Sequence, residues 1–419
     1  MSTQQSIETV ENALKYGYLP AFRNQITVTP SPFLEKVRKI PLVNNEIKAA
    51  APYGLNGGFA FGSSDTSATP EAGAQGFVGF TLDSKNMYVN IEISDKAVRL
   101  GSGNASSLLS ALDAEVKSAY GAANLNIGRA LFGNGKGILT ALSAAATSAK
   151  TVYVSDCRTL REGLLVDVYA NESATASSKT PTVTGARVKA VSRKYESGKK
   201  GYAVTLDKEI TASTALTAAS ETAVGTYGFL TVQKSYNNEI CGLGAVMDDG
   251  IPTLYGVPKE GNDWLKPLVI DAGKKLDDLV LYEGIKQAQD FRNSQIDMIL
   301  MGDKAFRAYQ NAIRTTNAVI TDKTMKFKGG AVGYTVLTGS REAVLVNERF
   351  VPEDEAWGVD TSAWQFHHSE LGFASENGAG AFSLMEDKAV YRALLTMYGN
   401  LICEAPGGCV RFINCAEEA

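Results

Sequence analysis

Positively charged side chains are missing from one long stretch of this 419-residue sequence. No lysine or arginine occurs between residues 49 and 84, where Gly, Ala, Ser and Thr dominate. A segment of this composition cannot bury enough apolar surface to fold alone. It nevertheless carries five aromatic side chains that a free linker would not need: Tyr53, Phe59, Phe61, Phe77 and Phe80. We therefore expect an extended arm that becomes ordered on something outside its own domain.

Other absences argue against several classes of protein. No run of eighteen apolar residues occurs, so we expect no membrane-spanning helix. A protein that binds nucleic acid tightly carries a continuous patch of basic residues. The net charge of −4 therefore argues against tight nucleic-acid binding. The N-terminus lacks the basic and then apolar segments of a secretory signal. Five cysteines, an odd number, do not suggest a disulfide framework, so we expect folding in a reducing cytoplasm.

Metal-binding and catalytic motifs are also missing. The chain has only two histidines, the adjacent His367 and His368, and no G-x-S-x-G elbow accompanies them. Three cysteines cluster near the C-terminus without the spacing of a zinc site: Cys403, Cys409 and Cys415. The sequence therefore predicts no metal site, no cofactor and no nucleophile.

Paired carboxylates occur where turns and helix starts need them. They are Asp248/Asp249, Asp277/Asp278 and the run Glu353, Asp354 and Glu355. Each group lies beside glycine or proline, or at the start of a helix, where acids cap the chain and oppose the helix dipole. Because no convergent polar constellation remains, we predict that the protein is not an enzyme.

The segment RALFGNGKGILTAL at 129–142 resembles a phosphate-binding loop, but the resemblance fails. Gly137 follows Lys136, where the metal-binding Ser or Thr should stand. The preceding apolar residues have helical spacing: Leu108, Leu112, Val116, Tyr120, Ile127 and Leu131. They predict a helix from Asn104, its N-cap, to Phe132. Gly133, Gly135 and Gly137 are then interpreted as a helix stop and hinge.

The rest of the chain predicts an α+β protein. Short β-rich runs separated by turn residues fill 151–234, which is typical of a small sandwich or barrel. After residue 235, helices capped by Asp277 and Asp303 alternate with strands. The first of these helices is expected to bury Leu281, Ile285, Ala288 and Phe291 on one face. Before the long helix, the three prolines of 26–48 indicate short extended segments. Apolar and polar residues alternate over Met87–Ile93, which predicts the return strand of the arm.

This order of elements resembles the major capsid proteins of tailed bacteriophages, which share the Hong Kong 97-like fold. The strand-to-helix step IDMILMGDKAFRAY and the strands GYTVLTGSREAVLVNERF leading into EDEAWGVD are similar to the axial domain of that family. The resemblance covers nearly the whole chain. It implies an N-terminal arm (1–35), an extended loop (36–100), a peripheral domain (101–150 and 351–419) with spine helix 104–132, an inserted β domain (151–234) and an axial α/β domain (235–350).

The resemblance also implies a function. The chain would self-assemble as hexamers and pentamers into the icosahedral head of a tailed phage, built in the bacterial cytoplasm around double-stranded DNA that it contacts only non-specifically. Inter-subunit contacts would come from the loop tip: Tyr53, Asn56, Gly57, Gly58, Phe59, Phe61 and Glu71. A separate scaffolding protein and a portal are expected partners, and a decoration protein is a further possible partner. The alternatives are an encapsulin-like nanocompartment shell and another self-assembling virion component.

Overall fold

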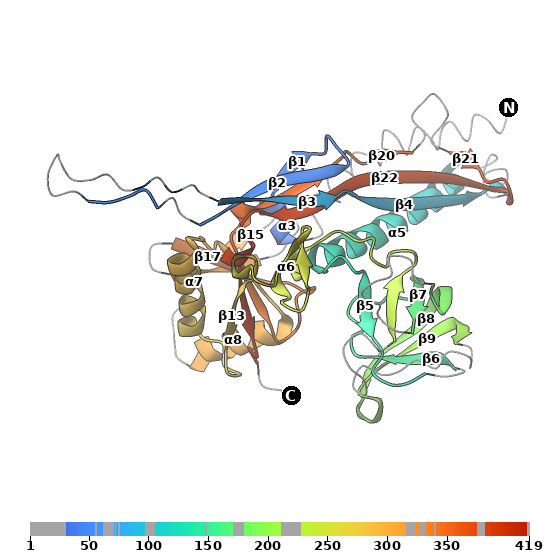
Figure 1. The fold of residues 1–419 in the computed structure, drawn as a ribbon. Coiled ribbons are helices and arrows are strands. Elements are labelled where there is room, and N and C mark those ends of the chain that lie inside the picture. The colour runs from blue at the N-terminus through green and yellow to red at the C-terminus, as the bar shows by residue number, and fades with distance from the viewer. Residues whose placement is uncertain are drawn as a thin grey trace. The chain divides into compact units, whose positions relative to one another are not determined.

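The computed structural model describes residues 31–54, 57–61, 71, 73, 76–96, 105–146, 149–170, 180–210, 228–315, 324–326, 332–338, 341–374 and 382–416. Its chain divides into two compact units (Figure 1). Unit 1 comprises Met1–Ile26, Tyr88–Gly244 and Phe373–Thr396, and unit 2 comprises Thr27–Met87, Ala245–Gly372 and Met397–Ala419. Each unit is described by itself.

The most prominent helix of unit 1 is α5 (Ala105–Phe132), which has 28 residues and is therefore about 42 Å long. The long helix predicted from the apolar spacing is confirmed, while its expected N-cap, Asn104, lies outside the described residues. Its C-terminal turn is buried through Leu131 and Phe132. In the part of the chain that can be described, no helix is both long and apolar enough to span a bilayer.

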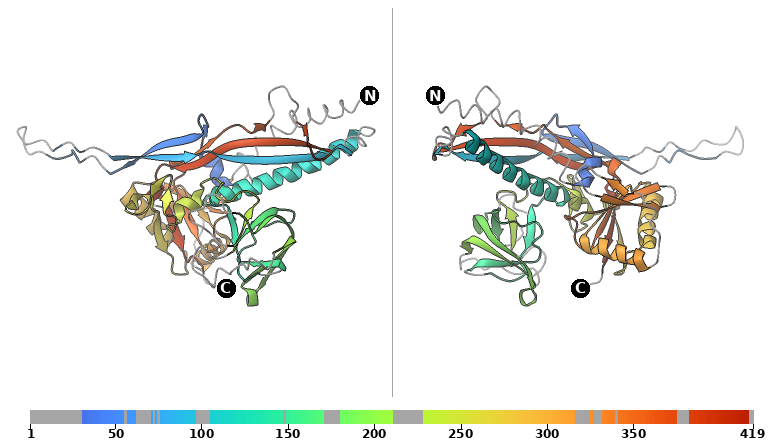
Figure 2. Two further views of the ribbon diagram at one scale, coloured as in Figure 1. Left: turned by 45° about the vertical axis from the view of Figure 1, so that its right-hand side comes forward. Right: turned by 180° about the vertical axis from the view of Figure 1, so that it is seen from behind.

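Unit 1 also contains a six-stranded antiparallel sheet. Its strands are β5 (Ile138–Ala141), β6 (Ala149–Val154), β7 (Leu165–Tyr169), β8 (Val183–Glu196), β9 (Gly201–Ile210) and β10 (Phe229–Val232). They are hydrogen-bonded in the order β5-β10-β7-β8-β9-β6. An isolated bridge between Leu142 and Val154 joins the two edges, so the sheet closes into a small barrel, seen from further sides in Figure 2. The strands that the sequence predicted between 151 and 234 are therefore present.

The barrel has its own apolar core. Val152, Val166 and Leu206 are among fifteen buried residues that form one cluster, as expected for alternating β-branched side chains in a closed sheet. Asp167, at 2% exposure, is one of the polar side chains buried in these strands. Its two carboxylate oxygens accept hydrogen bonds from the backbone N–H groups of Gly185 (2.7 Å) and Lys234 (2.8 Å).

The predicted return strand of the extended arm is wrong. Residues 87–93 lie in β4 (Lys85–Ser94), which pairs with β22 (Val390–Cys403) and not with the outgoing limb of the arm. The alternation that suggested this strand is real, because Val89, Ile91 and Ile93 are buried while Tyr88 is exposed. The outgoing limb instead pairs with an earlier strand, Gly76–Asp83.

Unit 2 is built on a seven-stranded mixed sheet. Its strands are β13 (Leu268–Asp271), β14 (Met298–Met301), β15 (Thr324–Lys326), β16 (Val332–Thr338), β17 (Arg341–Asn347), β18 (Ala356–Val359) and β23 (Val410–Ile413). Their order is β13-β23-β18-β14-β17-β16-β15, with β13/β23 and β14/β17 parallel. Helices α7 (Asp278–Arg292) and α8 (Asp303–Thr315) share one apolar core cluster with this sheet. The mixed α+β class is confirmed.

Helix α7 begins as the sequence predicted but does not bury every expected residue. The side chain of Asp277 accepts a hydrogen bond from Val280 N at 3.1 Å and caps the helix. Leu281 and Ala288 are buried, whereas Phe291 is 72% exposed, so its assignment to the core was wrong. Ten residues at 3.6 per turn place Phe291 about 80° around the axis from Leu281, in the last turn of the helix.

A second correction concerns the first residues that the structure describes. The sequence suggested extended chain here, but Pro32–Lys36 forms the short helix α3. Ser31 is its N-cap, and Pro32 occupies the first helical position, where its missing N–H is not needed. The hydroxyl of Ser31 accepts from Phe33 N at 3.2 Å and donates to Glu348 Oε2 at 2.7 Å. Strand β1 (Arg38–Pro41) then pairs with β19 (Trp364–His368).

Glu348 gives unit 2 a dependence on pH. Burial raises the pKa of its carboxyl to about 7, against opposing hydrogen bonds from Ser31 and backbone N–H groups. Because the native state then holds the proton more tightly than the unfolded chain, this group stabilises the fold below about pH 4.5, and the stabilisation is lost as pH rises through 7. At about 1.4 kcal/mol per pKa unit, the loss approaches roughly 3 kcal/mol.

We therefore expect Glu348→Gln to unfold at a higher urea concentration than the parent at pH 8, with a smaller difference or none at pH 5. Unfolding midpoints of the two proteins at both pH values measure this. Glu260→Gln, at an exposed position of the same unit, is the control and should leave the pH dependence unchanged. A parent that gains stability relative to Glu348→Gln between pH 5 and 8 would contradict the assignment.

Candidate assembly surface

The extended loop begins as a regular antiparallel hairpin of unit 2. Strand β2 (Glu46–Tyr53) pairs with β3 (Gly76–Asp83) in continuous register from Glu46 opposite Asp83 to Tyr53 opposite Gly76 (Figure 1). Ile47, Ala51 and Phe80 on this hairpin are buried. The part of this segment that lies in β2 and β3 is therefore ordered by strand pairing and by the burial of a few apolar side chains.

A row of aromatic rings anchors the base of this hairpin. Tyr53 and Phe80 each stack on Trp264, with ring centroids 5.7 and 6.0 Å apart, and Phe80 also contacts Tyr255 at 5.2 Å. Tyr255 in turn accepts a hydrogen bond from Cys403 N through its hydroxyl, at 3.0 Å. The sequence showed the aromatic residues of the arm but gave no sign of Trp264, which lies more than 180 residues further along.

Gly76 leaves room for this stack. A Cβ atom at Gly76 would lie 2.5 Å from Cζ of Tyr53, whereas one at Gly79 on the same strand would meet nothing within 4 Å. We expect Gly76→Ala to push the Tyr53 ring off Trp264 and to cost about 1 kcal/mol, the worth of an aromatic pair. Gly79→Ala is the matched control and should be neutral.

Urea unfolding followed by tryptophan fluorescence measures this difference. In a Tyr53→Ala background the ring is absent, so Gly76→Ala should lose most of its effect. A penalty that persists unchanged in that background would show that the Tyr53–Trp264 stack is not its cause.

The far end of the loop exposes apolar side chains. Phe59 is 75% and Phe61 is 92% exposed, and their rings meet edge to face with centroids 5.0 Å apart. Gly57, Gly58 and Glu71 are exposed as well, while Asn56 lies outside the described residues. Fully burying a phenylalanine is worth about 1.5–3 kcal/mol. This pair is therefore a surface that gains free energy when another surface covers it.

The three glycines after α5 make a tight turn. Gly135 and Gly137 have φ of 84° and 76°, the left-handed region that glycine tolerates best. A Cβ at Gly137 would also lie 2.6 Å from the carbonyl oxygen of Ser235. Gly133 ends the helix, its N–H donating to Ala130 O at 3.1 Å. The helix stop is confirmed by the end of α5 at Phe132, and motion about these glycines stays a prediction.

A buried ion pair lies one turn before this glycine segment. Arg129 and Glu239 have side chains only 9% and 8% exposed, and the guanidinium donates to both carboxylate oxygens, Nη1 to Oε2 at 2.7 Å. Gly242 packs so closely on the helix end that a Cβ there would be 2.2 Å from Leu131 O. The pair joins residues 110 positions apart, a separation that no local sequence pattern could have revealed.

The predicted turn and helix cap are confirmed for Asp248 and Asp277, whereas Asp278 and Glu355 make other contacts. Asp248 accepts from Gly250 N at 2.9 Å, and Asp278 accepts from the Tyr309 hydroxyl at 2.7 Å. Glu355 binds the guanidinium of Arg411, with Nε at 2.9 Å, and also accepts from Trp357 Nε1 at 2.8 Å. These contacts engage the carboxylates of Asp248, Asp278 and Glu355 within unit 2.

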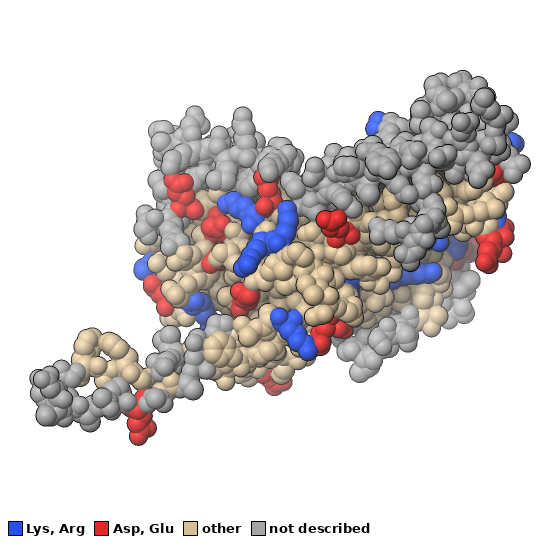
Figure 3. Space-filling model, turned by 90° about the horizontal axis from the view of Figure 1, so that it is seen from above, with Lys and Arg blue, Asp and Glu red and all other residues tan. Residues whose placement is uncertain are grey.

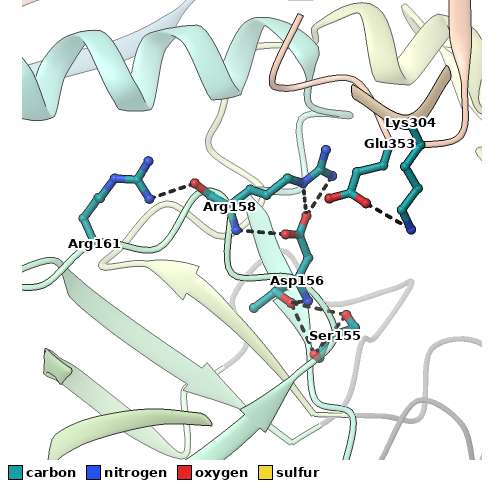
Figure 4. A network of polar contacts seen from close by, with 8 residues as sticks. Ser155, Asp156, Arg158, Arg161, Lys304 and Glu353 are labelled. Carbon is teal, nitrogen blue, oxygen red and sulfur yellow. Dashed lines mark hydrogen bonds and ion pairs between the residues drawn. The ribbon is translucent and has the colours of Figure 1, made fainter. Parts of the chain in front are cut away.

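Other polar side chains among the described residues also contact one another or the backbone. Figure 4 draws Asp156, whose carboxylate accepts from Arg158 N and Nε, both at 2.8 Å, in the turn after β6. The same figure draws the ion pair of Lys304 with Glu353, 3.1 Å apart, in unit 2. His367 contacts Gln365 at 3.2 Å and His368 contacts Ser369 O at 2.9 Å. Within the described ranges, no three His, Cys, Asp or Glu side chains gather as a metal site would require.

Comparison with known proteins identifies the fold. No protein-family model and no curated protein matches the sequence. A chain of the capsid asymmetric unit of cyanophage A-1(L) matches with a TM-score of 0.51 and 10% identity, over 95% of this chain and 93% of that one. A chain from Gordonia phage Cozz matches with a TM-score of 0.42, 11% identity and coverages of 91% and 86%. The SrpI encapsulin of Synechococcus elongatus PCC 7942 matches with a TM-score of 0.43 and 8% identity, over 93% of this chain and 91% of that one.

The cyanophage match covers almost all of both chains. This chain therefore has the Hong Kong 97-like fold of tailed-phage capsid proteins, as the element order predicted.

Proposed function

We propose that this chain is the major capsid protein of a tailed bacteriophage and that it assembles as hexamers and pentamers into an icosahedral head around double-stranded DNA. The observation that carries the proposal is the fold match to a phage capsid chain over 95% of this sequence. Its role is structural, without catalytic residues or cofactors. Its place is the virion, with assembly in the host cytoplasm.

Assembly uses the extended loop, whose end exposes Phe59 and Phe61. On a ring of identical subunits each chain offers the same surface to its neighbour, so one loop that covers a patch on the next subunit is repeated around the ring. Tyr53, Gly57, Gly58 and Glu71 belong to the same loop, as does Asn56. Ordering of the loop then accompanies assembly, which stabilises the subunit by mass action.

The remaining assignments follow from the same family pattern. The β-rich segment 151–234 is an insertion into the minimal capsid fold, and the segment 235–350, with β14, α7 and α8, is the axial domain. The peripheral domain contains α5 and the long strand β22. A separate scaffolding protein and a portal complete the assembly pathway.

Expression of the full chain in a phage-free bacterial host tests the proposal. Sedimentation and negative-stain microscopy should show closed shells, tubes, or rings of five and six subunits. A compact monomer at every concentration would overturn the proposal. Shells that enclose a second protein instead of accepting DNA through a portal would assign the encapsulin alternative.

A further inference from the structure

The end of the β8–β9 hairpin carries mainly positive charge. Residues 193–200, RKYESGKK, contain four basic side chains and one acidic side chain. Strands β8 and β9, with 14 and 10 residues, are the longest of the barrel, and their hairpin projects from its own sheet (Figures 1 and 2). We call Arg193–Lys200 the basic hairpin end.

The positive charges of this segment are not neutralised nearby. Every residue from 193 to 200 is exposed, and none of the four basic side chains forms an ion pair with an acid among the described residues. The single acid, Glu196, is engaged by the Tyr153 hydroxyl, since the charge of Glu196 and its hydrogen bond raise the pKa of Tyr153. Elsewhere the pattern differs: on the face shown in Figure 3, basic and acidic side chains are interspersed.

The basic hairpin end is also preorganised. Lys200 adopts the left-handed conformation at φ 49° that closes the turn. At Gly201 a Cβ would lie 2.1 Å from Ser143 Oγ and 2.3 Å from Val154 O, so only glycine allows the hairpin to pack this closely on β6. The Tyr195 and Tyr202 rings meet edge to face at 5.5 Å, and Lys199 Nζ lies 5.7 Å from the Tyr153 ring centroid.

We propose that the basic hairpin end binds the phosphodiester backbone of nucleic acid without sequence preference. Four exposed cations at the end of a two-stranded ribbon offer several contacts to a polyanion, and ribbons of this kind enter the grooves of nucleic acids. Tyr195, 53% exposed, offers a ring face to an unstacked base, which an acidic polypeptide would not use. The net charge of −4 repels a polyanion and therefore weakens this attraction.

Fluorescence anisotropy tests the proposal with the full chain kept below its assembly concentration, as checked by sedimentation. The probes are a labelled 30-base-pair duplex and a labelled 30-nucleotide single strand. Neutralising about four phosphates gives a slope near −3.6 in log affinity against log salt for duplex DNA, so binding should weaken roughly a hundredfold between 50 and 200 mM salt. Replacement of Arg193, Lys194, Lys199 and Lys200 by glutamine should abolish binding at 50 mM salt.

The matched control replaces four exposed lysines of unit 2, Lys48, Lys274, Lys275 and Lys286, by glutamine. It changes the net charge equally and should keep the affinity within about twofold. Tyr195→Ala should weaken single-strand binding at least fivefold and duplex binding little. Equal loss in both quadruple variants, or no binding by the parent at 50 mM salt, would overturn the proposal. Equal affinity for poly-glutamate of the same charge would assign an acidic polypeptide instead. Because subunits are measured before assembly, these outcomes are independent of whether shells form.

Discussion

Replacing Phe59 and Phe61 together by serine is expected to prevent assembly while leaving the subunit folded. The two rings are 75% and 92% exposed, so the isolated subunit loses almost nothing when they are removed. If a neighbouring subunit covers both, each loop contributes about 3 kcal/mol or more to association. The association constant should therefore fall at least about a hundredfold for each loop contact, measured as the threshold concentration for shells in sedimentation.

Val43→Ser is the matched control for this experiment. Val43 is 88% exposed, lies in the same unit and is also apolar, but it stands between β1 and β2, away from the loop end. Its threshold should match that of the parent. If Phe59 and Phe61 can both be replaced without a change in threshold, the loop end is not an assembly surface. A lowered unfolding midpoint would instead indicate a role within the subunit.

Replacing Arg129 by methionine is expected to destabilise unit 1 by about 3–5 kcal/mol. Glu239 would then be left as a buried carboxylate without its cation, and the desolvation of that charge dominates the loss. The damage falls where the end of α5 meets residues 239–244, because Gly242 packs against the Leu131 carbonyl there. Hydrogen exchange should show faster opening of the last helical turn, and chemical denaturation should show an earlier transition.

The double variant Arg129→Met with Glu239→Gln separates charge from packing. It removes the isolated charge, so it should recover most of the lost stability. If the double variant is as unstable as the single one, the loss comes from altered packing and not from the unpaired carboxylate. A single variant within about 0.5 kcal/mol of the parent would contradict the structural role given to the pair.

Elements with a strong local pattern could be predicted from the sequence. The spacing of Leu108 to Leu131 predicted α5 to within one residue, and Asp277 marked the start of α7. The short β-rich runs predicted strands β6 to β10 of the barrel but missed β5, which lies before residue 151. The order of elements predicted the Hong Kong 97-like fold. For the helices and strands, the signal came from neighbouring residues.

Errors arose where pairing partners or short helices decided the outcome. The alternation of Val89, Ile91 and Ile93 correctly indicated a strand, but nothing local showed that its partner is β22, about 300 residues away. Ser31 and Pro32 carried the signal of a helix start. The neighbouring Pro30 and Pro41 obscured it, because a cluster of prolines suggests extended chain. Phe291 has roughly the spacing of a core residue but lies in the last turn of its helix.

The candidate surface was only half visible in the sequence. Composition singled out the arm and its phenylalanines, because a lysine-free, glycine-rich segment with aromatic rings is unusual. It could not show that Trp264 and Tyr255 anchor the hairpin, or that Arg129 pairs with Glu239, because these contacts join distant positions. The sequence RKYESGKK shows the basic residues of the hairpin end, but only the structure shows that all of them are exposed.

Photo-crosslinking from the loop end tests the central claim most directly. With p-benzoylphenylalanine in place of Phe59, the assembled fraction is irradiated, and a mixture of isotopically light and heavy chains distinguishes crosslinks between subunits from those within one. We expect mixed light–heavy crosslinks that join position 59 to a neighbouring chain, and none in the unassembled fraction. Crosslinks confined to the same chain in both fractions, or a protein that never assembles, would contradict the account.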